Sequence, residues 1–262
     1  MIINNYKTEH IILVIILLLS SFGIIMMYSA SSVLAMNKYN NYLHFFLKQL
    51  NWLCIGTILM ILTSKINYFF LKKTAYFLLF TSWIILIMGY FFKGPSEVSR
   101  WIIIGGRNWM TTSDFSRISL IIFTAFFIDK NKKRLKDLNL LIFHFTPYIL
   151  ISLSLILFQP DTSTTILIST IIFIMLFIAG TNFYYLCGLI IMGISGFFLK
   201  IINTEYALER ILTWNDVQKI QSLNALGSGG FWGKGLGNSI IKKGFLPEVH
   251  TDFILPIVGE EL

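Results

Sequence analysis

Long stretches without charge alternate with short charged segments along the chain. A helix needs about 20 mainly apolar residues to cross the hydrocarbon core of a bilayer. Seven segments meet or approach this length, near residues 10–29, 49–65, 74–92, 113–128, 138–159, 161–179 and 183–202. An eighth begins near 252 and reaches the end of the sequence at 262. The pattern predicts an all-α polytopic membrane protein, a single integral membrane domain over 1–262 with about seven complete transmembrane helices and the start of an eighth.

Basic residues concentrate in two of the predicted loops. Loop 129–137 contains five lysines and arginines, and loop 65–73 contains three. Positive charge in short loops marks the cytoplasmic side of a membrane protein. We therefore expect these loops and the N-terminus to be cytoplasmic. The loops after odd-numbered spans then face outward, and 203–251 is a large extracytoplasmic loop before the eighth span.

The composition supports a membrane protein. Hydrophobic residues make up 55% of the chain and charged residues 13%, and the mean hydropathy is +0.72. Soluble domains carry about a quarter charged residues, so a disordered chain and an ordinary soluble enzyme are excluded. The formal net charge of +8 suits anionic lipid or phosphate and does not require a nucleic-acid partner.

The outer loop before the eighth span contains the candidate chemistry. Its run Gly227–Gly237 is dense in glycine, which lets a backbone approach a ligand closely and donate N–H groups to phosphate oxygens. A flexible outer loop is the alternative. Farther along, Glu248, His250 and Asp252 place two carboxylates and an imidazole just before the span. A carboxylate there can accept a proton from an attacking hydroxyl or contribute to a divalent-ion site. The alternative is that Thr251 or Asp252 caps the eighth helix.

Other polar pairs lie at the ends of predicted spans. Arg100 and Trp101, in outer loop 93–112, suit a phosphate headgroup or a sugar face, or else an aromatic anchor at the interface. Asp114 and Arg117 are three residues apart at a helix start, which favours an intrahelical ion pair. In the turn after residue 158, Asp161 is expected near the N-terminus of the next helix.

Several short motifs occur in a fixed order along the chain. They are Tyr28-Ser29-Ala30-Ser31, Arg100-Trp101, Gln159-Pro160-Asp161, Gln221-Ser222, Ala225–Gly230, Gly233–Ser239, Leu246–Phe253 and Gly259–Leu262. This set resembles the signature of the SEDS family, the FtsW/RodA/SpoVE proteins of bacterial cell division, elongation and sporulation. The amino-acid sequences of the motifs Gly233–Ser239 and Gly259–Leu262 are more similar to those of the FtsW-like division branch.

The resemblance implies a SEDS-type helical bundle. Members have about ten spans, so the chain resembles a C-terminally truncated form that ends inside the eighth. Two positions depart from the family pattern. Thr111–Asp114 with Arg117 stand where members usually have Gln-Pro-Ser-Glu and a lysine, and Thr162–Thr164 stand where members usually have Leu-Gly-Thr.

The resemblance also implies an activity. Members are inverting peptidoglycan glycosyltransferases of the bacterial cytoplasmic (inner) membrane, which polymerise lipid II during cell division or elongation and release polyprenyl pyrophosphate. The implied partners are a class B penicillin-binding protein and other divisome or elongasome membrane proteins. A lipid II flippase or transporter, and a non-catalytic divisome scaffold, are the alternatives.

The resemblance assigns roles to individual residues. Asp252 matches the essential acid of the family, as base or metal-orienting group. A divalent cation such as Mg²⁺ or Mn²⁺ is expected, and no organic cofactor. The expected pyrophosphate contacts, chosen by charge and outer location, are Arg100, Arg210, Lys234 and Lys243. Trp101 is expected to pack on lipid or sugar. The expected supporting residues are Glu248, His250, Asp114 and Arg117.

Overall fold

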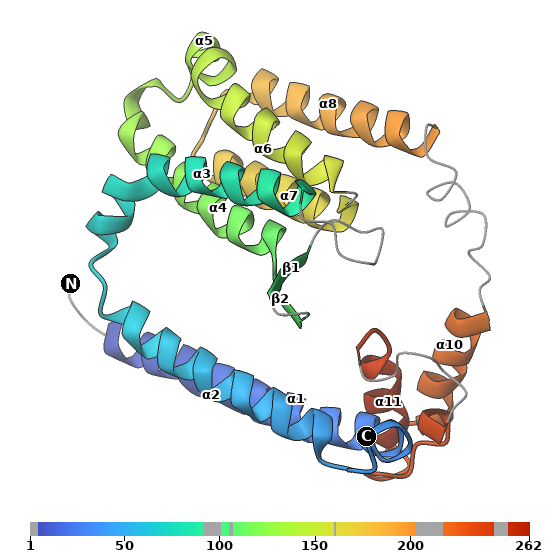
Figure 1. Cartoon of the computed structure of the whole chain (residues 1–262). Coiled ribbons are helices and arrows are strands. Elements are labelled where there is room, and N and C mark those ends of the chain that lie inside the picture. The colour runs from blue at the N-terminus through green and yellow to red at the C-terminus, as the bar shows by residue number, and fades with distance from the viewer. Residues whose placement is uncertain (1–4, 92–100, 105–106, 160, 203–216, 244–250) are drawn as a thin grey trace. The chain divides into compact units, whose positions relative to one another are not determined.

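The computed structural model describes residues 5–91, 101–104, 107–159, 161–202, 217–243 and 251–262 (Figure 1). The described part is largely helical, as the sequence predicts. It forms two compact units. The terminal unit comprises residues 1–65 and 206–262, and the central unit comprises residues 66–205.

The central unit contains most of the helices. In chain order its elements are α3 (Tyr68–Phe91), β1 (Trp101–Ile104), β2 (Arg107–Thr111), α4 (Thr112–Lys130), η1 (Lys132–Arg134), α5 (Leu138–Leu140), the π-helical turn η2 (Leu141–Phe145), α6 (Thr146–Phe158), α7 (Thr162–Ile178) and α8 (Phe183–Ile202). The two strands pair antiparallel, with Trp101 opposite Thr111. This hairpin lies in the expected outer loop 93–112 and is the only β-sheet among the described residues, which the all-α prediction did not include.

The hydrophobic core of the central unit lies among α3, α4, α6 and α7. Leu79 and Leu86 of α3 meet Phe123 of α4, Ile156 of α6 and Ile168 of α7, and all five are buried. The buried face of α4 also carries small hydroxyl residues, namely Thr112, Ser113, Ser116, Ser119 and Thr124. Small side chains let helices approach closely, which is typical of packing between membrane helices.

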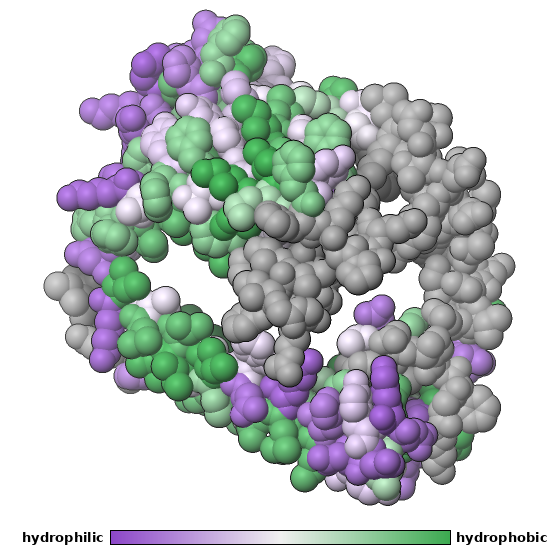
Figure 2. All heavy atoms as spheres, in the orientation of Figure 1, coloured by the Kyte–Doolittle hydropathy of each residue, from purple (hydrophilic) through white to green (hydrophobic). Residues whose placement is uncertain are grey.

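Charged residues join α3 to the last turn of α4 and to η1. The Asp129 carboxylate accepts from Lys72 Nζ at 2.5 Å and from Lys132 Nζ at 2.6 Å. Hydrogen bonds from Lys132 and Lys72 lower the pKa of Asp129 to about 2, so this carboxylate is ionised at neutral pH. In Figure 2, hydrophilic side chains gather over the region around α5, and hydrophobic side chains gather over the C-terminal part of α2.

The terminal unit joins the two ends of the chain. Its elements are α1 (Asn5–Tyr39), α2 (His44–Ser64), α10 (Val217–Gly229), η3 (Ile241–Lys243) and α11 (Ile254–Glu261). Helices α1 and α2 run antiparallel, side by side (Figure 1). The turn between them contains Asn40 at φ 52°. Helix α2 has no buried residue, as expected for a helix that faces lipid.

Four described helices are long and apolar enough to cross a membrane, judged by length and composition. They are His10–Tyr39, His44–Ser64, Tyr68–Phe91 and Leu138–Phe158, and shorter apolar helices cover Thr162–Ile178 and Phe183–Gly196. The apolar segments of the sequence thus lie in helices, but α1 continues past the predicted end at residue 29. The number of crossings stays a prediction.

Candidate functional site

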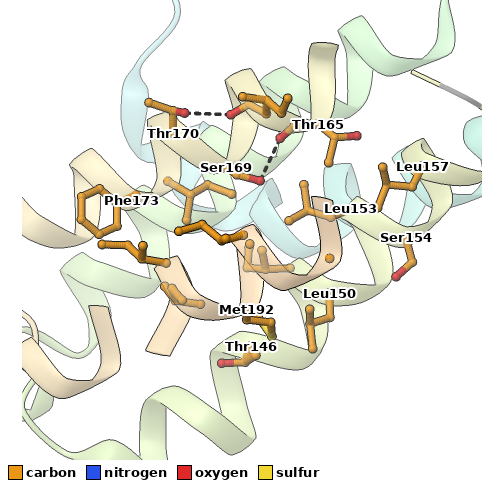
Figure 3. Close-up of a pocket in the computed structure, with 18 of the residues that line it drawn as sticks. Thr146, Leu150, Leu153, Ser154, Leu157, Thr165, Ser169, Thr170, Phe173 and Met192 are labelled. Carbon is orange, nitrogen blue, oxygen red and sulfur yellow. Dashed lines mark hydrogen bonds between the residues drawn. The ribbon is translucent and has the colours of Figure 1, made fainter. Parts of the chain in front are cut away.

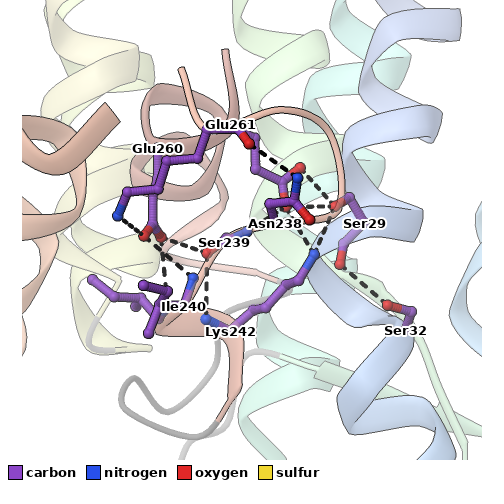
Figure 4. Close-up of polar contacts among 10 residues, drawn as sticks. Ser29, Ser32, Asn238, Ser239, Ile240, Lys242, Glu260 and Glu261 are labelled. Atoms are coloured by element: carbon purple, nitrogen blue, oxygen red, sulfur yellow. Dashed lines mark hydrogen bonds and ion pairs between the residues drawn. The ribbon is translucent and has the colours of Figure 1, made fainter. Parts of the chain in front are cut away.

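The two carboxylates at the end of α11 organise the glycine-rich run of the terminal unit (Figure 4). Glu260 is buried and accepts from Ser239 Oγ at 2.6 Å and from the Ile240 N–H at 3.2 Å. It also forms an ion pair with Lys234, whose Nζ lies 2.8 Å from Glu260 Oε1. Lys234 donates a second bond to Ser228 Oγ at 2.8 Å. The Glu260 side chain thereby binds several residues of the segment 228–240.

Glu261 makes a second, more deeply buried set of contacts (Figure 4). Its carboxylate accepts from Lys242 Nζ at 2.8 Å and from Ser29 Oγ at 2.7 and 2.8 Å. The Ser239 N–H adds a bond at 3.3 Å. Lys242 also donates to Ser29 Oγ at 3.2 Å. Since Ser29 belongs to α1, these bonds join the first helix of the chain to the last described one.

The glycine-rich run wraps around the end of α11. The Lys234 N–H donates to the Glu260 carbonyl at 2.9 Å, and the Gly235 N–H donates to the Glu261 carbonyl at 3.0 Å. Gly233 adopts φ 64°, and a Cβ there would lie 2.4 Å from the Glu261 carbonyl oxygen. Glycine is required for this close approach. Two N–H groups of the run therefore bind the protein's own carbonyls instead of a phosphate.

Helices α10 and α11 also meet through glycine. A Cβ on Gly229 would lie 2.0 Å from the Gly259 carbonyl oxygen, and one on Gly259 would lie 2.3 Å from Leu226 Cδ2. A side chain at Gly229 would meet backbone and force the helices apart, whereas one at Gly259 would require the Leu226 side chain to move. The motif Gly259-Glu260-Glu261 thus combines close helix contact with two buried acids.

Asp252 lies in the turn directly before α11 and is exposed. The N-cap of α11 is Phe253, and no side chain caps this helix. The interpretation of Thr251 or Asp252 as its cap is therefore wrong, because α11 begins after both. Asp252 has no hydrogen bond or ion pair with any other described residue, whereas Glu260 and Glu261 are saturated. Of the three carboxylates described in the terminal unit, only Asp252 is available to a ligand.

The remaining predicted site residues divide into three groups. Arg100, Arg210, Glu248 and His250 lie outside the described residues. Trp101 lies in β1 and Lys243 in η3, and only their backbones are described. Lys234 is described, and 31% of its side chain is exposed beside Glu260. Within the described ranges, no three His, Cys, Asp or Glu side chains come together as metal ligands.

Sequence reasoning missed the buried partners Ser29, Ser239, Lys242, Glu260 and Glu261. Glu260 and Glu261 were visible as two acids in an apolar segment, and such ionisable residues often mark functional sites in membrane proteins. Ser29 belongs to the motif Tyr28-Ser29-Ala30-Ser31, but nothing in the sequence pairs it with Glu261, which is 232 positions away.

A polar cluster in the central unit contains the other expected contacts. Asp114 pairs with Arg117 at 3.0 Å, which confirms the intrahelical ion pair. Asp161 caps α7 by accepting from the Thr164 N–H at 3.2 Å, as predicted, and also accepts from Ser113 Oγ at 2.8 Å.

Gln159 extends this cluster. Its Oε1 accepts from Thr112 Oγ1 at 2.5 Å, and its Nε2 donates to the Leu86 carbonyl at 2.7 Å. These bonds fasten the start of α4 and the end of α3 to the turn between α6 and α7. All the bonds of this cluster join parts of the protein to one another, so its role in the described structure is to hold the helices together.

An apolar groove of about 750 Å³ lies among α6, α7 and α8 (Figure 3). Most of its hydroxyl groups are hydrogen-bonded within the protein. Thr165, Ser169 and Thr170 each donate to the carbonyl four residues earlier, at 2.8–2.9 Å. Thr146 bonds to Tyr185 Oη at 2.8 Å. The groove therefore suits an apolar chain and not a polar headgroup.

The chain is similar to proteins of one family along nearly all of its length. The family described as cell cycle protein, FTSW_RODA_SPOVE, matches residues 9–262. A probable peptidoglycan glycosyltransferase FtsW of Trichlorobacter lovleyi is 36% identical, over 96% of this chain and 69% of that protein. Stage V sporulation protein E of Bacillus subtilis is 32% identical, over 96% of this chain and 72% of that protein.

A solved structure has the same fold. It is described as "Structural coordination of polymerization and crosslinking by a peptidoglycan synthase complex". The match has a TM-score of 0.64 at 17% identity and covers 91% of this chain and 69% of that chain. At this identity the likeness supports the fold alone.

Proposed function

Because the chain belongs to the FtsW/RodA/SpoVE family, we propose that it is a peptidoglycan glycosyltransferase of the bacterial cytoplasmic membrane that polymerises lipid II. A sugar hydroxyl of one substrate attacks the anomeric carbon of the other. The new glycosidic C–O bond forms as the bond to the pyrophosphate oxygen breaks, on the opposite face, so the centre is inverted. The hydroxyl proton passes to a base, and polyprenyl pyrophosphate leaves with the bonding electrons.

The free carboxylate of Asp252 is the observation that carries this proposal. A general base must be ionised, accessible and not already engaged by donors within the protein. Asp252 is exposed and has no described partner, while Glu260 and Glu261 each accept several bonds. Asp252 is therefore the proposed base, and the two glutamates hold the segment around it.

Cations are needed to offset the charge on the leaving pyrophosphate. Lys234 is the described candidate, because part of its ammonium-bearing side chain is exposed while Glu260 holds its position. Arg100, Arg210 and Lys243 are the further candidates by charge. We assign Glu248 and His250 supporting roles beside Asp252, and Trp101 a packing role on lipid or sugar.

A divalent cation such as Mg²⁺ or Mn²⁺ fits the chemistry of the free Asp252 carboxylate, since both ions prefer oxygen ligands. Within the described residues Asp252 would be its one ligand, and Glu248 and His250 are the neighbouring candidates. Such an ion would supply positive charge for the pyrophosphate.

The groove among α6, α7 and α8 is the proposed site of the polyprenyl chain. Its lining is largely apolar, and four of its hydroxyl residues, Thr146, Thr165, Ser169 and Thr170, already bond to the protein, so a hydrocarbon chain can enter without breaking those bonds. Lipid II carries such a chain, which is consistent with a substrate drawn from the membrane. A class B penicillin-binding protein is the proposed partner.

The test is product formation by the purified chain in lipid vesicles that contain lipid II, with and without the class B penicillin-binding protein. We expect glycan strands, seen as a ladder on a denaturing gel, at least when the partner is present. Movement of lipid II across the bilayer without polymer would contradict the proposal and indicate a transporter. Absence of both activities, in a folded and partner-bound protein, would indicate a scaffold.

A further inference from the structure

Two aromatic side chains in the terminal unit are exposed to an unusual degree. Phe231 is 101% exposed and Trp232 is 94% exposed, more than any other large hydrophobic residue that the structure describes. They lie between Gly230 at φ 62° and Gly233 at φ 64°. Both glycines adopt the left-handed conformation that other residues rarely take, so the chain turns sharply on either side of the two aromatic residues.

This turn is held in place by its surroundings. Directly after Gly233, the Lys234 and Gly235 N–H groups bind the last carbonyls of α11, and Lys234 Nζ pairs with Glu260 at 2.8 Å. The aromatic residues are therefore presented by a bonded backbone. Two large apolar side chains are exposed here on a backbone that hydrogen bonds hold in place. Such an exposed apolar surface indicates a binding surface.

The contacts of Glu261 give the level of this turn relative to the bilayer. Residues 10–29 of α1 rise about 30 Å at 1.5 Å per residue, which matches the hydrocarbon thickness of a bilayer. The large apolar residues from Ile11 to Leu19 are exposed, as expected for lipid contact. Glu261 binds Ser29, at the far end of this stretch. With the first span ending near residue 29, as the sequence predicts, the glycine-rich run lies at the boundary between hydrocarbon and headgroups, where tryptophan is enriched.

Helix α10 presents a second apolar surface. Ile220 and Leu223 are exposed and three residues apart, so they share one side of the helix, whereas Leu226 lies against Gly259 of α11. Ala225 and Gly229 face the other way, since Ala225 is buried and Gly229 contacts Gly259. With 13 residues, α10 is too short to cross a bilayer. An exposed apolar face on a short helix is typical of a segment that lies in the membrane interface.

We propose that Phe231 and Trp232, together with the exposed face of α10, form a bilayer anchor. The two aromatic side chains insert among the headgroups and upper acyl chains of the leaflet at the Ser29 end of α1. The anchor fixes the depth of the segment that leads to Asp252. Its partner is the lipid surface, and the inference does not depend on the proposed enzymatic activity.

Tryptophan fluorescence tests the anchor in the full chain, reconstituted in nanodiscs of phosphatidylethanolamine and phosphatidylglycerol. The chain has six tryptophans, so the Trp232 signal is obtained by subtracting the spectrum of Trp232→Phe. We expect this difference signal to be blue-shifted and quenched by lipids brominated on the acyl chain, with little quenching by aqueous iodide. Quenching by iodide and not by brominated lipid would overturn the proposal.

A nitroxide label gives an independent measurement. The label is placed at Trp232→Cys in a Cys54→Ser/Cys187→Ser background, with Lys133→Cys as the aqueous reference and Leu59→Cys as the lipid reference. We expect position 232 to resemble position 59, with oxygen more accessible than a water-soluble nickel complex. Accessibility like that of position 133 would contradict a bilayer anchor. Protection that arises only after the penicillin-binding protein is added would also overturn it, in favour of a protein partner.

Discussion

Lys242 and Glu261 form an ion pair inside the terminal unit, with 2.8 Å between Nζ and Oε1 and side chains that are 5% and 0% exposed. Ser29 of α1 bonds to both partners. Charges so far from water are tolerated when they are paired and hydrogen-bonded. The pair therefore fixes η3 and α11 against α1, and with them the turn that contains Asp252.

Breaking this pair on one side should destabilise the protein. Glu261→Gln leaves the Lys242 ammonium buried without its counter-charge, at a cost of about 3–5 kcal/mol in the free energy of unfolding. Thermal unfolding in detergent micelles would measure the effect. Arg117→Met is the control, and we expect it to cost about 1 kcal/mol or less, because both side chains of the Asp114–Arg117 pair are partly exposed.

The double variant Lys242→Met/Glu261→Leu removes both charges together. It should be more stable than Glu261→Gln alone, because no unpaired buried charge remains. A double variant that unfolds at the same temperature as Glu261→Gln, or at a lower one, would contradict the interpretation of the two side chains as a pair.

Two glycines of α10 provide a second test of the packing. Gly229→Ala places a methyl group 2.0 Å from the Gly259 carbonyl oxygen and should destabilise the unit by about 1–3 kcal/mol. Gly227→Ala meets nothing within 4 Å and should be neutral or stabilising by up to about 1 kcal/mol, since alanine favours helix. Equal unfolding temperatures for the two variants would contradict the close contact of α10 with α11.

The sequence predicted the helices far better than the contacts between them. The apolar runs that lie in α1, α2, α3, α6 and α7 are visible because composition alone identifies a membrane helix. The hairpin of β1 and β2 was missed, since strands of four and five residues give too short a pattern to recognise.

In the candidate site too, local features were predicted and long-range contacts were not. Asp252 was identified from its motif, and the Asp114–Arg117 pair and the Asp161 cap from short-range spacing. The network of Glu260 and Glu261 could not be identified in this way. Its members come from α1, the glycine-rich run and α11, and a contact across 232 positions depends on tertiary packing.

The groove among α6, α7 and α8 can be tested by filling it. Gly193 lines the groove and Gly188 does not, and a Cβ at either position on α8 meets nothing within 4 Å. Gly193→Leu should lower kcat/KM for lipid II with a long polyprenyl chain by about tenfold, because the added side chain occupies its site. Gly188→Leu should leave it unchanged. An equal loss with a short-chain lipid II analogue would contradict the assignment of the groove to the polyprenyl chain.

The orientation of the chain can be tested by labelling single cysteines. In the Cys54→Ser/Cys187→Ser background, Lys133→Cys lies in the basic loop after α4 and Asn224→Cys lies on α10. The basic loop is expected to be cytoplasmic. A membrane-impermeant reagent added to whole cells should therefore label position 224 and leave position 133 unmodified. The reverse pattern would contradict both the orientation and the outer location of the site.

The catalytic assignment of Asp252 is tested most directly by the rate of lipid II polymerisation by Asp252→Asn with its partner synthase. Asparagine keeps the shape of the side chain but cannot act as a base, so the rate should fall by about 10²-fold or more. Membrane insertion, unfolding temperature and partner binding should not change, because Asp252 bonds to no described residue. Glu248→Gln, measured alongside, should have a milder effect. An Asp252→Asn protein that polymerises lipid II at the parent rate would contradict the central claim.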